Sequence, residues 1–144
     1  EWDKIFSFIP EKKKFLTSRQ SHEKILSYPE NIQYKIKITS KLFNPSIGKY
    51  KENYYSGSRK LPKGWKLRFN VDTSNIFDPK KVFWQVVNNG TEAERAGDLR
   101  GEILDDQGNN QRDEHTKYGG THYVNCFVVK NGSCVAKDRF FVKI

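Results

Sequence analysis

Apolar and polar residues alternate strictly along residues 32–43, whose sequence is IQYKIKITSKLF. The apolar positions of its first half recur at every second residue, at Ile32, Tyr34, Ile36 and Ile38. Because successive side chains of a β-strand point to opposite faces, this pattern predicts an antiparallel strand with one buried and one exposed face.

Several later segments have strand character but differ in how much of each face they bury. WKLRFNV at 65–71 alternates again, whereas KVFWQVV at 81–87 is too apolar to have an exposed face. Residues 44–64 predict a long loop with short strand pieces. The remaining strands are predicted at 98–104, as a short edge strand, and at 121–130 and 133–144, as a terminal hairpin.

This succession of short strands and turns favours an all-β sandwich or a small barrel, with little helix. Trp84 lies in the middle of its strand, where a core tryptophan fills the space between two sheets. Together with the long terminal hairpin, it favours an immunoglobulin-like β-sandwich of about seven strands. Phe69 stands where an antibody domain carries a paired cysteine, so the likeness is one of architecture.

One folded domain is expected at residues 31–144, preceded at 1–30 by a basic linker with a short irregular or helical lead-in. The chain contains no methionine and opens with EWDKIF, so we expect it to be part of a longer protein. It shows no signal peptide, and no apolar run approaches the roughly 18 residues of a membrane span. We therefore expect a cytoplasmic domain without membrane contact.

Two cysteines flank an Asn-Gly dipeptide, the strongest short signal for a two-residue hairpin turn. In the ideal register Val129 faces Cys134 and Cys126 faces Lys137, so the two thiols project from opposite faces and do not bond. Free thiols fit a reducing cytosol. The same register turns Lys137 toward the face of Cys126, so we expect a bulge near Asp138 if that face is buried.

Charge adds a hint about partners. The net charge is +9, and basic residues gather in the part 11–68, whereas residues 92–114 are close to neutral or acidic. A basic surplus attracts phosphate-bearing partners in a strongly salt-dependent way. Nucleic acid binding through a basic surface is one interpretation, and a solvated lysine-rich surface is the other.

The residues that commonly carry catalysis or metals do not form a usable pattern. His122 and Cys126 lie four positions apart on a strand, about 13 Å by rise, which is beyond hydrogen-bond reach. The histidines and cysteines lack the close paired spacing of zinc modules, and no phosphate-binding P-loop occurs. We therefore expect no catalytic residue, no metal and no cofactor.

A polar cluster instead predicts a ligand-reading site at one end of the sandwich, where loops commonly carry recognition. Its members are Asn88, Glu92, Arg100, Glu114, Tyr118 and His122. Tyr118 and His122 are suited to stack on a base, and Arg100 to contact a phosphate with two nitrogens. The two glutamates are suited to accept from base or ribose donors, and Gly119-Gly120 to let the backbone approach a ligand.

The same residues also have a purely structural interpretation. Either glutamate can form an ion pair with Arg100 that fixes two loops, and Asn88 can simply build its turn. Tyr118 can pack with its hydroxyl tied to the backbone. The sequence leaves both interpretations open.

Two stretches carry a resemblance to a known family. FWQVVNNGTEAERAGDLRGEI (83–103) followed by EHTKYGGTHYVNCFVVKNGSCVAKDRFFVKI (114–144) resembles the AGS-C domain, the adenylyl/guanylyl and SMODS C-terminal sensor domain. The matching motifs are Trp84, Val86, Asn88, Gly90, Glu92-Ala93, Leu99-Arg100-Gly101, Glu114, Thr116, Tyr118, Gly120, His122, Tyr123, Val124, Cys126, Asn131-Gly132, Cys134, Val135, Ala136, Phe140 or Phe141, Val142 and Ile144. The match covers roughly residues 81–144, and residues 30–80 fit only loosely.

The resemblance implies a non-enzymatic sensor fused behind a bacterial CD-NTase/SMODS nucleotidyltransferase of anti-phage (CBASS-like) defence. Such a domain senses a nucleotide-like or other ligand and regulates the attached enzyme. Consistent with a sensor, SGSRK at 56–60 is not followed by the Asp-x-Asp of a transferase. The alternatives are a basic nucleic-acid-binding module, using residues 11–68, or a protein-interaction domain that presents Tyr50, Tyr54 and Tyr55.

Overall fold

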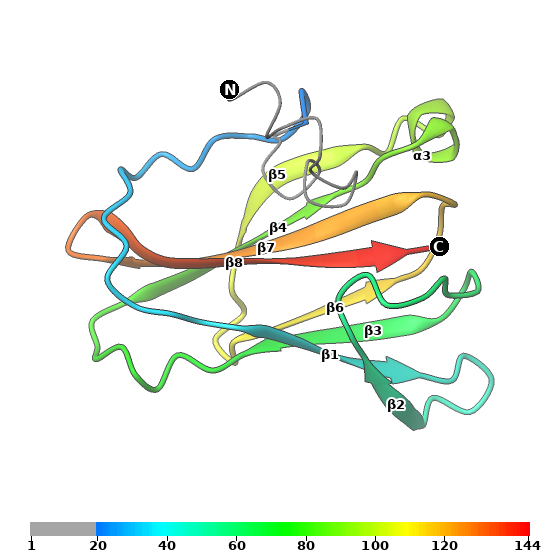
Figure 1. The fold of residues 1–144 in the computed structure, drawn as a ribbon, viewed down its shortest axis with the longest axis horizontal. Coiled ribbons are helices and arrows are strands. Elements are labelled where there is room, and N and C mark those ends of the chain that lie inside the picture. Colours follow the sequence, from blue (N-terminus) through cyan, green and yellow to red (C-terminus); the bar gives the residue numbers. More distant parts are fainter. Residues whose placement is uncertain (1–19) are drawn as a thin grey trace, which may run out of the picture.

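Two antiparallel four-stranded sheets pack face to face in the computed structural model, which describes residues 20–144 (Figure 1). The first sheet has the order β2-β1-β3-β6 and the second the order β5-β4-β7-β8. Within residues 20–144 the strands are β1 (Ile38–Phe43), β2 (Tyr50–Tyr54), β3 (Lys66–Val71), β4 (Lys81–Val87), β5 (Arg100–Asp105), β6 (Gln111–His115), β7 (Thr121–Lys130) and β8 (Ser133–Lys143), and the one helix of this part is the short α3 (Thr91–Arg95). The all-β sandwich is confirmed, with eight strands rather than about seven; most of the lead-in predicted at 1–30 lies outside the described residues.

The core lies between the sheets and is built from the alternating residues that the sequence predicted. Leu67 and Phe69 of β3 are 2% and 1% exposed, and they face the second sheet. Trp84 of β4 is fully buried, which confirms its predicted place in the core. Its indole Nε1 donates to Asp106 Oδ1 at 2.8 Å, so burial leaves this polar atom paired.

The terminal hairpin closes with the predicted two-residue turn. Asn131 and Gly132 have φ values of 53° and 77°, as a type I′ turn requires. Val129 pairs with Cys134, as the ideal register predicts. Beyond this pair the register shifts, and the rest of the hairpin follows a new alignment.

The bulge that causes this shift lies at Val135, between Cys134 and Ala136, and not near Asp138 as predicted. In this position it returns Ala136 to the core and turns Lys137 outward, which an ideal hairpin would not achieve. Cys126 consequently faces Asp138 rather than Lys137. Both cysteines are buried and free.

The strand predicted at 32–43 is regular only from Ile38 onward. Before that point the chain runs beside β8 of the second sheet, where Asn31 N–H donates to Cys134 O at 2.9 Å and Tyr34 N–H to Val135 O at 3.0 Å. The chain then crosses to the first sheet as β1. Because the segment changes partners, its alternation does not bury every apolar residue, and Ile32 is 48% exposed.

Three further expectations need correction. The loop predicted before the terminal hairpin contains β6, an edge strand whose residues are all polar, so it lacks an alternating apolar signal. Residues 88–97, expected only to interrupt the strands, contain α3. Tyr54, expected on the surface, is 2% exposed, because its hydroxyl donates to Arg59 O and accepts from Lys143 N–H.

Residues 20–37, which we call the N-terminal strap, run along the second sheet before β1 (Figure 1). The part around Glu23 lies on the side away from the core, whereas Tyr34 and Ile36 pack against the core. Lys24 N–H donates to Gly101 O at 2.9 Å. The Glu23 carboxylate, 7% exposed, accepts from Tyr123 OH at 2.5 Å and from Arg139 Nη2 at 3.0 Å. The Glu23 carboxylate is thus buried between the strap and the second sheet together with its hydrogen-bond partners, as a buried carboxylate requires.

Candidate functional site

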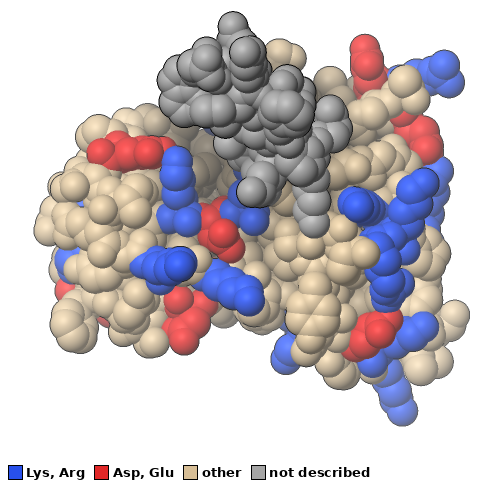
Figure 2. Space-filling model, in the orientation of Figure 1, with Lys and Arg blue, Asp and Glu red and all other residues tan. Residues whose placement is uncertain are grey.

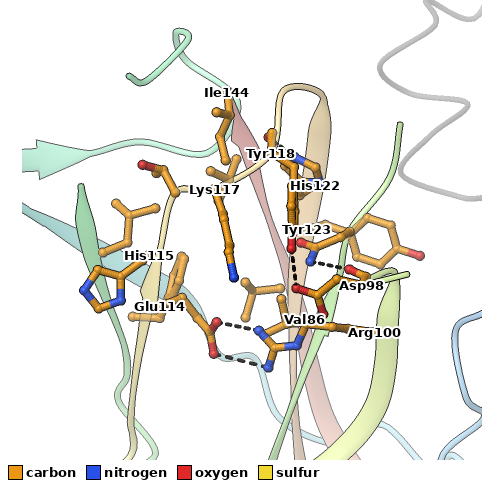
Figure 3. Close-up of a pocket in the computed structure, with 16 residues that line it drawn as sticks. Val86, Asp98, Arg100, Glu114, His115, Lys117, Tyr118, His122, Tyr123 and Ile144 are labelled. Carbon is orange, nitrogen blue, oxygen red and sulfur yellow. Dashed lines mark hydrogen bonds and ion pairs between the residues drawn. The ribbon is translucent and has the colours of Figure 1, made fainter. Parts of the chain in front are cut away.

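A cavity of about 230 Å³ lies between the sheets where the edge strands β5 and β6 face each other (Figure 3). Five of the six residues predicted as a ligand site line it: Asn88, Arg100, Glu114, Tyr118 and His122. Glu92 does not line it. The sequence therefore identified one real cluster, although the chain separates its members by up to 34 positions.

Arg100 and Glu114 connect the two edge strands across the cavity. Arg100 Nη1 lies 2.5 Å from Glu114 Oε1, and the side chains are 20% and 18% exposed. Glu114 also accepts from Arg112 Nε at 2.8 Å, and Glu102 lies 3.5 Å from Arg100 Nε. The structural alternative is thus correct in one respect: Arg100 is held by a carboxylate, so a phosphate has to compete for it. We call this ion pair the edge clamp.

The backbone at Arg100 is itself unusual. Its φ is 59°, in the left-handed region that costs an L-residue roughly 1–2 kcal/mol. The pairing of β4 with β5 shifts register between Gln85 and Val87, opposite this position. Such strain persists where the surrounding structure determines it, and here that structure directs the guanidinium toward β6.

Tyr118 is fixed to the segment that precedes β5. Its hydroxyl donates to Asp98 Oδ2 at 2.8 Å, and this hydrogen bond raises the pKa of Tyr118. Asn88 Nδ2 donates to the backbone oxygen of Asp98 at 2.9 Å. Asp98 thus joins two predicted site residues, although sequence reasoning missed it; its place beside the Leu-Arg-Gly motif was the available signal.

His122 is 4% exposed and has both ring nitrogens occupied. Its Nδ1 accepts from Asn89 N–H at 2.9 Å, so Nε2 carries the proton and donates to Tyr118 O at 2.7 Å. Burial lowers the pKa of His122, which keeps the imidazole neutral. In this arrangement His122 orders the loop that presents Tyr118.

Glu92 lies in α3, outside the cavity, where it supports the same loop. It accepts from Gly119 N–H at 3.1 Å and forms an ion pair with Lys63. Gly120 has a φ of 141°, and a Cβ there would lie 2.7 Å from Asn89 O. The double glycine thus lets one loop approach another loop.

Lys117 is a cavity residue that the sequence cluster did not include. Among the described residues that line the cavity, it is the cation without a carboxylate ion pair. Its Nζ lies 5.6 Å from the ring centroid of Tyr118, and Figure 3 shows the side chain extending toward the edge clamp. The available signal was its position next to Tyr118. That position alone does not distinguish a lysine that lines a cavity from a lysine on the solvated surface.

Cys126 belongs to the core, and burial raises the pKa of its thiol. No group of three or more histidine, cysteine or acidic residues within residues 20–144 is placed to hold a metal ion. None of the helices in this described part is long and apolar enough to cross a membrane.

These features define an all-β sandwich domain with a polar cavity between its sheets. The family model of the adenylyl/guanylyl and SMODS C-terminal sensor domain matches residues 14–144. The chain belongs to this family, and the match extends well beyond the residues 81–144 that carried the resemblance. No curated protein matches the chain.

Proposed function

We propose that this sensor domain is non-enzymatic and binds a nucleotide, or one unit of an oligonucleotide, in the cavity between β5 and β6. The attached enzyme would be a bacterial nucleotidyltransferase of anti-phage (CBASS-like) defence, working in the cytosol. The observation that carries the proposal is the pairing of an aromatic ring with an uncommitted cation, Tyr118 and Lys117, at a cavity lined by further polar groups.

The size of the cavity limits what enters it. At about 230 Å³ it is below the roughly 300–1,000 Å³ of sites for drug-sized ligands. It therefore suits a single base or sugar, with phosphates at the mouth. A base stacks on Tyr118, and Lys117 supplies charge to a phosphate. Asn88 and Asp98 supply the hydrogen-bonding groups that distinguish one base from another.

Arg100 gives the site a means of responding to the ligand. A phosphate near Lys117 competes with Glu114 for the guanidinium, which binds phosphate and carboxylate with the same geometry. Exchange of partners loosens the edge clamp. Gly101, the next residue, holds the strap through Lys24, and a Cβ there would lie 2.2 Å from His22 O. When the edge clamp loosens, β5 can shift and move the strap with it. The strap lies on the N-terminal side of the sandwich, where a C-terminal domain joins the rest of its protein.

We infer further that the sandwich is immunoglobulin-like. The order β4-β7-β8 corresponds to strands C, F and G of that fold, with β5 in the place of C′. Trp84 on β4 then occupies the position of the core tryptophan on strand C. In this arrangement the cavity lies at the flank of the sandwich between β5 and β6.

The test is a thermal-shift and calorimetric screen with mononucleotides, linear dinucleotides and cyclic oligonucleotides at low and near-physiological salt. One small nucleotide should raise the melting temperature at both salt concentrations. Lys117→Ala and Tyr118→Ala should remove that shift, while Lys81→Ala, an exposed lysine at the start of β4, should retain it. No response to any nucleotide, or an unchanged response in both cavity variants, would refute the proposal.

A further inference from the structure

The first sheet has an uncovered outer face, on the side away from the core. The register places Tyr50, Phe43 and Lys66 in one row across β2, β1 and β3. The next row contains Asn53, Lys41, Arg68 and Asp113, and the third contains Thr39, Asn70 and Gln111. We call these residues the outer face; each is exposed or partly exposed.

Aromatic rings and cations lie against one another on this face. Lys66 Nζ lies 5.0 Å and Arg68 Cζ 5.1 Å from the ring centroid of Phe43. Lys41 Nζ lies 5.9 Å from the ring centroid of Tyr50, which is 51% exposed. Figure 2 shows basic side chains gathered over the end of the molecule that holds β2. The face therefore presents π-surfaces and positive charge within a few ångströms of each other.

The charge of the outer face is positive after ion pairing. Asp113 is its one carboxylate; it lies 2.8 Å from Arg68 Nε and 3.4 Å from Lys66 Nζ. The hydrogen bond with Arg68 lowers the pKa of Asp113, so it stays ionised near neutral pH. Lys41, Lys66 and Arg68 exceed this single negative charge.

We propose that the outer face binds single-stranded nucleic acid. Bases stack on Tyr50 and Phe43 while Lys41, Lys66 and Arg68 contact the phosphates, which is how non-specific single-strand sites combine rings and charge. The cations that now cover the rings are long side chains that move to phosphate oxygens and leave a ring face to a base. A sheet face that presents rings on neighbouring strands, here β1 and the edge strand β2, suits unstacked bases.

Other partners fit this face less well. A duplex keeps its bases stacked inside, so the rings would gain nothing from it. The core of a protein–protein interface is depleted of lysine, whereas here a lysine lies against each ring. A polymer with unstacked bases and regular negative charge complements both properties of the outer face, and this surface is separate from the proposed nucleotide cavity.

The experiment is fluorescence anisotropy of the full 144-residue chain with labelled oligo-dT, oligo-U, a duplex of equal length and heparin as competitor. Tyr50→Ala should weaken binding of either single strand at least about fivefold, because stacking on one ring is lost. Tyr50→Phe should retain binding, because the ring remains. Lys41→Ala should reduce the slope of log K against log salt concentration by about 0.7, the loss of one phosphate contact.

The matched control is the same charge reversal at an exposed lysine of the other sheet. Lys41→Glu should abolish most binding, whereas Lys81→Glu, the same change at the start of β4, should leave it unchanged. Circular dichroism confirms that each variant is folded. Equal losses from both reversals, tighter binding of the duplex, or full binding by Tyr50→Ala would overturn the proposal and leave a general basic surface. These outcomes do not depend on the result of the nucleotide screen.

Discussion

Removal of one side of the edge clamp should destabilise the domain measurably. Glu114→Gln keeps the shape of the side chain and removes its charge, so Arg100 loses its nearest carboxylate while Glu102, at 3.5 Å, remains. Both clamp side chains are less than a third exposed, at 20% and 18%, so solvent screens them only in part. A hydrogen bond to a charged group in such a setting contributes about 1.5–3 kcal/mol.

We therefore expect Glu114→Gln to lower the free energy of unfolding by about 2 kcal/mol, a fall in melting temperature of roughly 4–8 °C for a chain of this size. The assay is a double-mutant cycle with Glu114→Gln, Arg100→Gln and the double variant, measured by urea unfolding. The cycle also cancels the cost of changing the left-handed Arg100, because that change occurs in both arms. The coupling energy should reach about 1–2 kcal/mol.

The control is the ion pair of Glu52 with Arg59, whose side chains are 44% and 47% exposed. An exposed pair of this kind should give a coupling below about 0.5 kcal/mol. If the clamp couples no more strongly than this exposed pair, it does not hold the edge strands together. The proposed response to phosphate would then lose its physical basis.

Three more predictions follow from buried groups and close contacts. Because burial lowers the pKa of His122 below the ordinary histidine value of 6.5, its share of stability is complete above that pH and is lost as pH falls through the folded pKa. Melting curves between pH 7 and pH 5 should show this loss, and His122→Asn should reduce it; an identical pH profile would contradict the assignment. Burial raises the thiol pKa of Cys126 and Cys134, so a thiol reagent at pH 8 should label neither in the native protein and both after denaturation. Gly101→Ala places a Cβ 2.2 Å from His22 O at a φ of 110°, so it should lower stability by more than about 2 kcal/mol and speed tryptic cleavage after Lys24; unchanged proteolysis would show that the strap does not depend on this contact.

Strands whose environment is uniform along their length were predictable from the sequence. The strand β3 keeps one face in the core and one outside throughout, so a period of two identifies it. The strand β6 is an edge strand of five polar residues, and only its pairing with β3 shows that it is a strand. The segment before Ile38 has a clear alternation, but it changes sheets, which no local pattern reveals.

The candidate site was predictable as a cluster but not as a set of roles. Polar residues gathered near strand ends identified Arg100, Tyr118 and His122 as neighbours. Whether a histidine contacts a ligand or orders a loop depends on which atoms surround its nitrogens, and those atoms come from distant segments. Lys117 was missed because a cation without a carboxylate partner is recognised only once the structure shows that Arg100, the other cation lining the cavity, is paired with Glu114.

The strap has a consequence for the order in which the chain folds. Glu23 meets Arg139 across 116 positions of sequence, so the contacts of the strap with the terminal hairpin form only once β8 is available. Contacts over such separations close slowly, because a long loop must be ordered before they contribute. During synthesis, any domain upstream of the strap emerges first and has time to fold while the sandwich is incomplete. The catalytic partner proposed above would then exist, for a short interval, without its assembled sensor.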